Sequence, residues 1–368
     1  MIEQIAIEHF KSIRKAEFVT KPLTVLSGTN SAGKSSLLQS LMMMNWLEKH
    51  QTDYLPLSEL EGLSLGQCQD ALCAKAATTD ITFSATRDGH CFSWVFDAAE
   101  PENPFLTVTQ KPEAPNPDQR LFGDFFFLDS ERHGPRASYR VESKPLEQLG
   151  VGFRGEFAPY LLAINERATV RESLCHPEAL RSRGDRWLKH QVEHWMGEFV
   201  PKIEFQSDLI PGTDRVRLSL KHAGVDSEWI QPANAGFGIC YTLPIVVAGM
   251  LTQPGTVLIV QNPEAHLHPR AQSRMGYFLA HLAASGAQVF VETHSDHLLN
   301  GIRLSVAGAK APIAHDQVIF HFLTMANAET HPITIDINAK GELSEWPDGF
   351  FDQTEKDLNH LFRTQIHG

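Results

Sequence analysis

The sequence has little positive charge, no paired cysteines and no long apolar run. Its 32 lysine and arginine residues face 44 aspartate and glutamate residues, and the net charge of −12 argues against broad electrostatic binding to DNA. The five cysteines stand at irregular spacings, which is typical of reduced thiols and not of a disulfide framework. No apolar run approaches the roughly twenty residues of a membrane span, and no signal peptide pattern opens the chain. We therefore expect a cytoplasmic protein that has no membrane partner.

What the sequence does contain is a complete phosphate-binding motif. Residues 28–36, Gly-Thr-Asn-Ser-Ala-Gly-Lys-Ser-Ser, fit the pattern G-x-x-x-x-G-K-[ST] at every fixed position. An apolar, partly β-branched run at 23–26 precedes the motif, and a helical pattern follows from Lys34. Strand, loop and helix thus come in the order that a P-loop requires, whereas an ordinary glycine-rich turn needs no such context. The sequence therefore predicts a nucleotide site.

The residues of this motif have distinct expected roles. Gly28 and Gly33 allow backbone conformations that turn successive N–H groups inward, and the start of the following helix adds its positive end. Lys34 is expected to reach the β- and γ-phosphates, and the Ser35 hydroxyl is expected to bind Mg²⁺. The residues predicted to surround the phosphates are Gly28, Asn30, Ser31, Ala32, Gly33, Lys34, Ser35 and Ser36.

Three stretches of the N-terminal third have patterns typical of β structure. Apolar and polar residues alternate over residues 1–20, as in half-buried antiparallel strands. Residues 79–97 hold two such runs around Asp88-Gly89, which predicts a hairpin. Residues 98–119 carry five prolines around a strand-like run at 105–109, which predicts an exposed excursion.

Two charged stretches suggest contacts with a ligand or a partner. Residues 130–136, which include Arg132, follow an apolar strand, where α/β folds usually place ligand-binding loops. A charged contact to nucleotide and a solvated turn both fit this loop. Further along, an amphipathic helix with one basic face is predicted, and either solvent, nucleic acid or a protein could meet that face. Its basic residues are Arg181, Arg183, Arg186 and Lys189.

The C-terminal half contains two apolar strands that end in polar motifs. Residues 256–260 form a β-branched run that ends at Gln261, and residues 288–291 form a second run that leads into 292–297. A helical pattern at 270–284 connects them, which predicts a right-handed β-α-β crossover in a parallel sheet. In a P-loop enzyme, the end of the first of these strands carries the Walker B residues.

The polar motifs after these strands also have the residue types of a metal site. Imidazole and carboxylate groups are common zinc ligands, and five of them occur here. The chain order of P-loop, strand with acidic turn, and strand with Thr-His favours a nucleotide site, because ATP-binding-cassette heads have the same order. The five residues are Glu264, His266, His268, His294 and His297.

Four motifs together resemble the ABC-type ATPases of the SMC, RecF and OLD (overcoming lysogenization defect) group. They are the opening Ile-Glu-His-Phe-Lys-Ser-Ile at 7–13, the P-loop, the turn Asn-Pro-Glu-Ala-His-Leu-His-Pro at 262–269, and Thr-His-Ser at 293–295. Within that group, residues 234–239 and the tail Trp-Pro-Asp-Gly-Phe-Phe-Asp at 346–352 resemble bacterial OLD-like AAA ATPases. Residues 50–119 and the basic helix are the parts that the resemblance covers least.

The resemblance implies an α/β fold and a domain plan. The fold is an ABC-ATPase head with a mixed or parallel P-loop sheet, an antiparallel β subdomain and a helical insertion. Residues 1–165 would form the N-terminal ATPase lobe, with a β insertion at about 50–127. Residues 166–228 would form a helical and β insertion. Residues 229–368 would form the C-terminal lobe, with the signature-like, Walker B-like and switch-histidine motifs.

The resemblance also implies that two subunits sandwich two ATP molecules, each between the P-loop of one subunit and the signature loop of the other. Asn234, Gly236 and Gly238 match the signature position and would face the γ-phosphate across the dimer, ahead of an apolar helix at 241–251. The usual signature serine is absent, and a plain helix-capping turn is the alternative. His294 matches the switch histidine, which would hydrogen-bond the γ-phosphate.

The sequence departs from the resemblance at Gln261 and Asn262. ABC enzymes usually hold Mg²⁺ with an acidic residue at the first position and place a catalytic glutamate at the second. An amide has no charge to stabilise the metal and cannot act as an effective general base. Glu264 is close enough in sequence to replace the missing carboxylate in part, and Gln261 is also what an engineered Glu→Gln change would leave. Hydrolysis is expected to be slow, with Lys34, Gln261, Asn262, Glu264 and His294 as the catalytic set and Ser35 and Gln261 as the metal set.

The function implied is an ATP- and Mg²⁺-dependent ATPase that forms a homodimer or higher oligomer and controls a separate effector. The chain carries no nuclease motif, so the effector would be a nuclease or toxin on another protein, in bacterial anti-phage defence. Gln261 and Asn262 favour a second hypothesis, a non-hydrolysing scaffold that is gated by nucleotide. A third is a DNA-repair head that grips nucleic acid, although the absence of long heptad arms weakens an SMC-like role.

Overall fold

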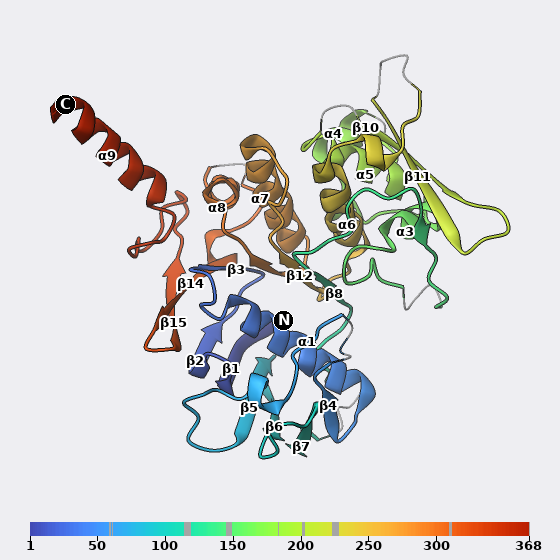
Figure 1. Ribbon diagram of the computed structural model, residues 1–368. Helices are drawn as coiled ribbons and strands as arrows, with labels where there is room; N and C mark the ends of the chain where they lie inside the picture. The colour runs from blue at the N-terminus through green and yellow to red at the C-terminus, as the bar shows by residue number, and fades with distance from the viewer. Residues whose placement is uncertain are drawn as a thin grey trace. The chain divides into compact units, whose positions relative to one another are not determined.

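The chain forms two compact units in a computed structural model (Figure 1). Unit 1 contains residues 1–121, 292–296 and 315–368, and unit 2 contains residues 122–291 and 297–314. Each unit is described by itself. The structure describes residues 1–58, 60, 62–113, 119–144, 149–182, 184–200, 203–222, 228–308 and 311–367. Residues 114–118 of the predicted proline-rich excursion and Arg183 of the predicted basic helix lie outside these ranges.

Unit 1 contains a six-stranded antiparallel sheet, in the order β2-β1-β5-β6-β7-β4. Alternation along β1 buries Ile5 and Ile7 fully, as the period of two predicts. Asp88 and Gly89 take positive φ angles of 51° and 75°, the geometry of a tight hairpin turn. The predicted hairpin is therefore confirmed. The strands are β1 (Ile2–Phe10), β2 (Ile13–Val19), β4 (Tyr54–Pro56), β5 (Asp80–Arg87), β6 (His90–Asp97) and β7 (Phe105–Gln110).

Unit 1 also contains the P-loop strand. In this part of the unit, β14 (Val318–Ala326) lies between β3 (Leu23–Gly28), to which it is parallel, and β15 (Glu329–Asp336), to which it is antiparallel. The helix α1 (Lys34–His50) follows the loop and buries most of its side chains. The backbone N–H of Thr293 donates to the carbonyl of Leu26 at 3.0 Å, so the 292–296 segment runs beside the P-loop strand. The predicted order of strand, loop and helix is confirmed.

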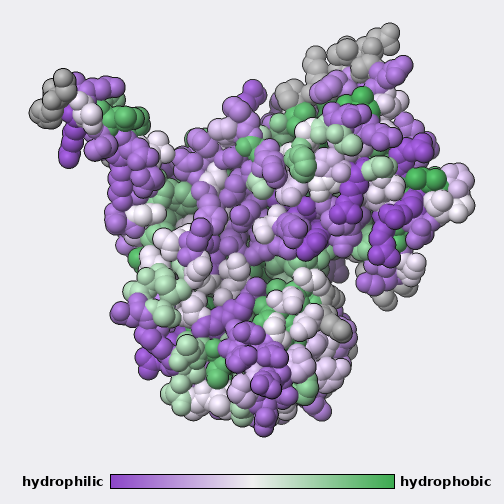
Figure 2. Space-filling model, viewed as in Figure 1, coloured by the Kyte–Doolittle hydropathy of each residue, from purple (hydrophilic) through white to green (hydrophobic). Residues whose placement is uncertain are grey.

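Among the described residues of unit 1, the other α-helices are α2 (Cys68–Ala71) and α9 (Gln353–His367). Every described side chain of α9 is exposed, and apolar atoms are visible on it in Figure 2. Leu358, Leu361 and Phe362 are 48%, 55% and 57% exposed, respectively. Among the described residues of the whole chain, no helix is both long enough and apolar enough to cross a membrane.

Unit 2 contains a second parallel pair of strands and the helices around it. Strand β12 (Val257–Gln261) lies between β8 (Phe125–Leu128), to which it is parallel, and β13 (Gln288–Glu292). The helix α7 (Pro269–Ala284) connects β12 to β13, so the predicted strand-helix-strand element is present. A separate antiparallel sheet has the order β10-β11-β9, with bounds Ile203–Leu209, Arg215–His222 and Tyr139–Arg140. The other helices are α3 (Ala158–Ile164), α4 (Pro177–Ser182), α5 (Leu188–Met196), α6 (Phe237–Leu251) and α8 (Asp296–Val306).

The core of unit 2 joins α5 to α7 through Trp195, which is fully buried. Its ring packs against the Phe278 ring at 4.9 Å, and its indole N–H donates to the carbonyl of Leu174. Beside it, the Glu198 carboxylate lies 3.0 Å from His176 Nε2 and accepts from Arg274 Nε at 2.7 Å. The hydrogen bond with His176 and then the contact with Arg274 lower the pKa of Glu198 to about 2.

The basic helix predicted around residues 181–195 is wrong in one respect. Gly184 takes a φ of 71°, and α4 and α5 are separate helices on either side of it. Among the described basic residues of the segment, only Lys189 lies on α5. Arg186 pairs with Glu172 and Lys189 with Glu166, so these two charges meet acidic side chains of the same chain.

Candidate functional site

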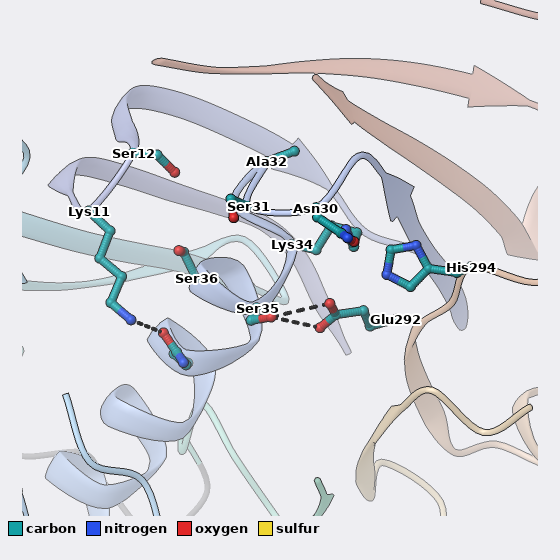
Figure 3. Close-up of a pocket in the computed structure, with 12 residues that line it drawn as sticks. Lys11, Ser12, Asn30, Ser31, Ala32, Lys34, Ser35, Ser36, Glu292 and His294 are labelled. Carbon is teal, nitrogen blue, oxygen red and sulfur yellow. Dashed lines mark hydrogen bonds between the residues drawn. The ribbon is translucent and has the colours of Figure 1, made fainter. Parts of the chain in front are cut away.

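The P-loop of unit 1 opens into a pocket of about 510 Å³ (Figure 3). Four segments contribute its walls: the turn between β1 and β2, the P-loop, the first turns of α1 and the segment after β13. Seven of the eight residues predicted to surround the phosphates line it, together with His294, which is far from them in sequence. The described lining residues are Lys11, Ser12, Asn30, Ser31, Ala32, Gly33, Lys34, Ser35, Ser36, Gln39, Glu292 and His294.

The glycines of the P-loop are required by its backbone. Gly28 has a φ of 142°, and a Cβ at this position would collide with the carbonyl oxygen of Leu323. Gly33 has a φ of 94°, and a Cβ there would lie 2.5 Å from Thr330 Oγ1. Gly33 is also the N-cap residue of α1, so the N–H groups of the first helical turn begin at the pocket. This arrangement suits an anion, because both the N–H groups and the helix dipole favour negative charge.

Lys34 is folded against the loop that it belongs to. Its ammonium group donates to the carbonyl of Gly28 at 3.0 Å and to the carbonyl of Thr29 at 2.8 Å. Burial lowers the pKa of Lys34, and the nearby charge of Glu292 opposes that change. The lysine therefore places a positive charge in the pocket, held by backbone carbonyls that a phosphate group would compete with.

Ser35 is hydrogen-bonded to a carboxylate that the sequence analysis did not select. Its hydroxyl lies 3.1 and 3.2 Å from the two carboxylate oxygens of Glu292, as Figure 3 shows. Glu292 is the last residue of β13 and only 6% exposed. The available signal was an acidic residue at the end of a fully apolar strand, two positions before the switch-like histidine.

His294 and Lys11 complete the polar lining of the pocket. Burial, followed by the charge of Lys34, lowers the pKa of His294, so its ring is neutral at pH 7 and has one N–H to donate. Lys11 donates to Gln39 Oε1 at 2.7 Å. Lys11 belongs to the opening motif, but no role was predicted for it or for Gln39.

The Walker B-like turn lies in unit 2, where a buried arginine holds its backbone. One terminal nitrogen of Arg132 donates to the carbonyl of Gln261 at 2.6 Å and to that of Asp129 at 2.8 Å, and the other donates to the carbonyl of Asn262 at 2.7 Å. Asn262 itself has a φ of 44°, in the left-handed region. Burial lowers the pKa of Arg132 to about 10, which leaves it charged at pH 7.

Of the two interpretations of the 130–136 loop, the solvated turn does not apply to Arg132, because its side chain is 2% exposed. Its guanidinium also lies over the Tyr241 ring, 5.3 Å from the ring centroid. Three backbone carbonyls and an aromatic face surround the charge, so Arg132 fixes the loops that meet at the end of β12.

The signature-like loop lies in unit 2 beside the turn that follows β12. Asn234, Gly236 and Gly238 line a cavity of about 420 Å³, with His266 and His268 on its wall. The helix α6 begins at Phe237, earlier than the predicted start at 241, so Gly238 falls in its first turn. A Cβ on Gly238 would lie 2.7 Å from the carbonyl oxygen of His266, so this close approach needs a glycine.

The metal interpretation of the histidine motifs has no support among the described residues. Within these residues, no three or more histidine, cysteine, aspartate or glutamate side chains are grouped so that they could hold a metal ion.

The chain was compared with protein-family models, with curated proteins and with solved structures. Residues 123–300 match a family described as "AAA domain, putative AbiEii toxin, Type IV TA system". Residues 313–361 match a family described as "Protein of unknown function (DUF3696)", and this range includes the tail at 346–352. The search of curated proteins found no match.

Two solved structures of SMC heads have a similar fold. One is a crystal structure of an SMC head bound to the C-winged helix domain of ScpA, with a TM-score of 0.52 and 11% identity over 91% of this chain and 97% of that chain. The other is the Pyrococcus furiosus SMC head with an extended coiled coil, bound to the C-terminal domain of ScpA. It has a TM-score of 0.53 and 12% identity over 98% of this chain and 99% of that chain.

These comparisons confirm the predicted fold class. The chain has the mixed α/β fold of an ABC ATPase head, with parallel and antiparallel sheets. The AAA-domain match at 123–300 supports a P-loop ATPase. The assignment to the OLD-like subgroup stays a prediction.

Proposed function

We propose that this chain is an ABC-type ATPase that binds ATP and Mg²⁺, dimerises around ATP and uses its nucleotide state to control a separate effector protein. The observation that carries the proposal is the pocket of unit 1, in which a complete P-loop, Lys34, Ser35 and a neutral His294 are arranged around one space. Polyphosphate is the ligand that such a set of donors fits.

The donors of the pocket would each bind a different part of the triphosphate or its metal. The first N–H groups of α1 and the Lys34 ammonium would bind the β- and γ-phosphates, and the neutral His294 ring would donate to the γ-phosphate. The Ser35 hydroxyl is a hard oxygen ligand of the kind that Mg²⁺ prefers. When bound, Mg²⁺ supplies charge stabilisation to the phosphate oxygens.

Hydrolysis by this chain is expected to be slow. Gln261 and Asn262 carry amides where a metal carboxylate and a general base are usual, and an amide does neither task well. Glu264 is the remaining acidic group of the Walker B-like segment. Its charge opposes the lowering of the Arg132 pKa by burial, so the two charges interact favourably. The contribution of Glu264 as a partial replacement stays a proposal.

The assembly and the biological role follow from the motifs beyond the P-loop. Asn234, Gly236 and Gly238 would face the γ-phosphate of a second subunit, so an ATP-bound homodimer or a higher oligomer is the expected active form. The match to an AbiEii-type AAA domain supports a role in a bacterial toxin or anti-phage system. The effector would be a nuclease or toxin on another protein, and this chain would be located in the cytoplasm.

A second candidate is a scaffold that binds ATP without hydrolysing it. The amides of Gln261 and Asn262 favour this function, because they remove the base but leave the phosphate donors of the P-loop in place. A DNA-binding head is less favoured now, since Arg186 and Lys189 are paired with acidic side chains.

ATP hydrolysis and the ATP-dependent mass of the purified protein test the proposal. We expect the natural chain to bind ATP and dimerise with slow turnover, Lys34→Ala to lose both binding and dimerisation, and Gln261→Glu to hydrolyse ATP faster. Binding and dimerisation without turnover in either the natural chain or Gln261→Glu would establish the scaffold function. Absence of ATP binding by the natural chain would refute both.

A further inference from the structure

We propose that Glu292, at the end of β13, supplies the carboxylate of the magnesium site in place of the residue that is missing at Gln261. The inference rests on the proposed function, because it assigns a residue to the metal of the same nucleotide site. It replaces the sequence-based metal set of Ser35 and Gln261 by Ser35 and Glu292.

The position of Glu292 beside Ser35 is the first argument. The hydroxyl of Ser35 is within hydrogen-bond distance of both carboxylate oxygens of Glu292, at 3.1 and 3.2 Å. Ser35 is the P-loop residue that binds the metal in a motif of this kind. A carboxylate that reaches this hydroxyl is close enough to act on the same cation, either directly or through a bound water.

The chemistry of the donor set is the second argument. Mg²⁺ is usually bound by one or two carboxylates together with phosphate oxygens and waters, and rarely by a cage of protein ligands. One hydroxyl and one carboxylate in a phosphate-binding pocket satisfy this requirement. Three protein ligands are not needed, which agrees with the absence of such a group among the residues that the structure describes.

The burial of Glu292 is the third argument. A carboxylate that is 6% exposed is costly to keep ionised unless cations or hydrogen-bond donors compensate its charge. Lys34 provides part of that compensation, since the two charges attract each other. A divalent cation beside Ser35 would add to it at the point where the carboxylate already meets a donor.

Strands β12 and β13 are neighbours in the sheet, and they end in Gln261 and Glu292 respectively. The usual carboxylate at the end of the first strand is an amide here, while the second strand ends in a carboxylate. The carboxylate that lies beside Ser35 is thus the one at the end of β13.

The affinity for a slowly hydrolysed ATP analogue, measured by calorimetry with MgCl₂ and again with EDTA, tests this inference. The natural protein is expected to bind the analogue more tightly with Mg²⁺. Glu292→Gln keeps the size of the side chain and an oxygen that accepts from Ser35, so it should preserve the affinity in EDTA. Its affinity for the analogue in MgCl₂ should be roughly 10- to 100-fold lower than that of the natural protein, the range seen when groups that support a metal are removed.

Glu329→Gln is the matched control. Glu329 is a carboxylate of unit 1 that pairs with Arg14 and Lys75, and it is not among the described residues of the pocket. Its removal changes the net charge by the same amount and should leave the gain from Mg²⁺ intact. Electron paramagnetic resonance of Mn²⁺ bound with the analogue gives a second readout, in which Glu292→Gln should reduce the bound fraction.

The outcomes separate this inference from the function on which it rests. If the natural protein binds no analogue under either condition, the proposed function fails and the inference fails with it. If it binds with a gain from Mg²⁺ that Glu292→Gln retains, the inference alone is overturned. The same holds if Glu264→Gln, and not Glu292→Gln, removes the gain. Should Glu292→Gln not fold, Glu292→Ser replaces it, and an unaltered gain from Mg²⁺ in that variant overturns the inference.

Discussion

Replacing Arg132 by methionine is expected to destabilise the end of β12. The change removes the charged donors but keeps a long apolar side chain that can fill most of the space. Three carbonyl oxygens, those of Asp129, Gln261 and Asn262, then lose donors that lie 2.6 to 2.8 Å away.

The magnitude follows from these contacts. Each hydrogen bond to a charged group contributes about 1.5–3 kcal/mol, so the three bonds of Arg132 represent roughly 5–9 kcal/mol before any offset. Removing the buried charge offsets part of this loss, because the folded protein no longer has to hold a guanidinium away from water. We expect a net loss of about 3 kcal/mol in the free energy of unfolding of unit 2. The stability of Arg132→Lys should lie between that of the natural protein and that of Arg132→Met, since an ammonium keeps the charge but cannot reproduce the planar fork of the guanidinium.

Hydrogen exchange followed by mass spectrometry locates this effect, and urea denaturation measures it. Peptides that cover residues 257–268 should exchange faster in Arg132→Met, whereas peptides from the P-loop strand should keep their rates. The control is Arg154→Met, which removes an exposed arginine paired with Glu131 and should cost less than about 1 kcal/mol. The reasoning is refuted if Arg132→Met costs no more than Arg154→Met, or if Arg132→Lys equals the natural protein.

Two further predictions concern stability. Glu198→Gln should destabilise the protein by at most about 3 kcal/mol at pH 7, because the folded pKa of Glu198 is about 2 against an ordinary value of 4.5. This stabilisation is complete above pH 4.5 and is lost as the pH falls toward 2. In urea denaturation, the difference in free energy of unfolding between the variant and the natural protein should therefore be smaller at pH 3 than at pH 7. An equal difference at both pH values would contradict the prediction. Gly238→Ala should lower the free energy of unfolding by about 1–3 kcal/mol, since its Cβ would lie too close to the carbonyl of His266. Gly123→Ala should be tolerated, because no atom lies nearer than 3.9 Å to the added Cβ.

The parts of the fold that local patterns determine could be predicted from the sequence. The P-loop is one such part, because its glycines, its apolar strand and its helix are neighbours in the chain. The hairpin at Asp88-Gly89 is another, since two turn residues between alternating strands specify their own geometry. The fold class was implied by the resemblance to ABC-type ATPases, and the similar SMC heads confirm it.

The contacts that complete the site could not be predicted in this way. Ser35 and Glu292 are 257 positions apart, and no local periodicity connects them. The environment of Arg132 was left open, because the carbonyl groups that surround it come partly from residues 129 and 130 positions away. The prediction of one continuous basic helix was wrong for a local reason, since a glycine in the left-handed region divides the segment.

The two amides of the Walker B-like turn separate the requirements for binding ATP from those for hydrolysing it. Binding needs N–H groups, a lysine and a carboxylate near the metal, and Lys34 and Glu292 provide the last two within unit 1. Hydrolysis also needs a group that removes a proton from water, and an amide at Asn262 cannot do so. If Glu292 serves the metal, the metal does not need the carboxylate that Gln261→Glu adds. A gain in turnover from Gln261→Glu would then require the base to be the new carboxylate or Glu264, the two acidic residues of that segment in the variant.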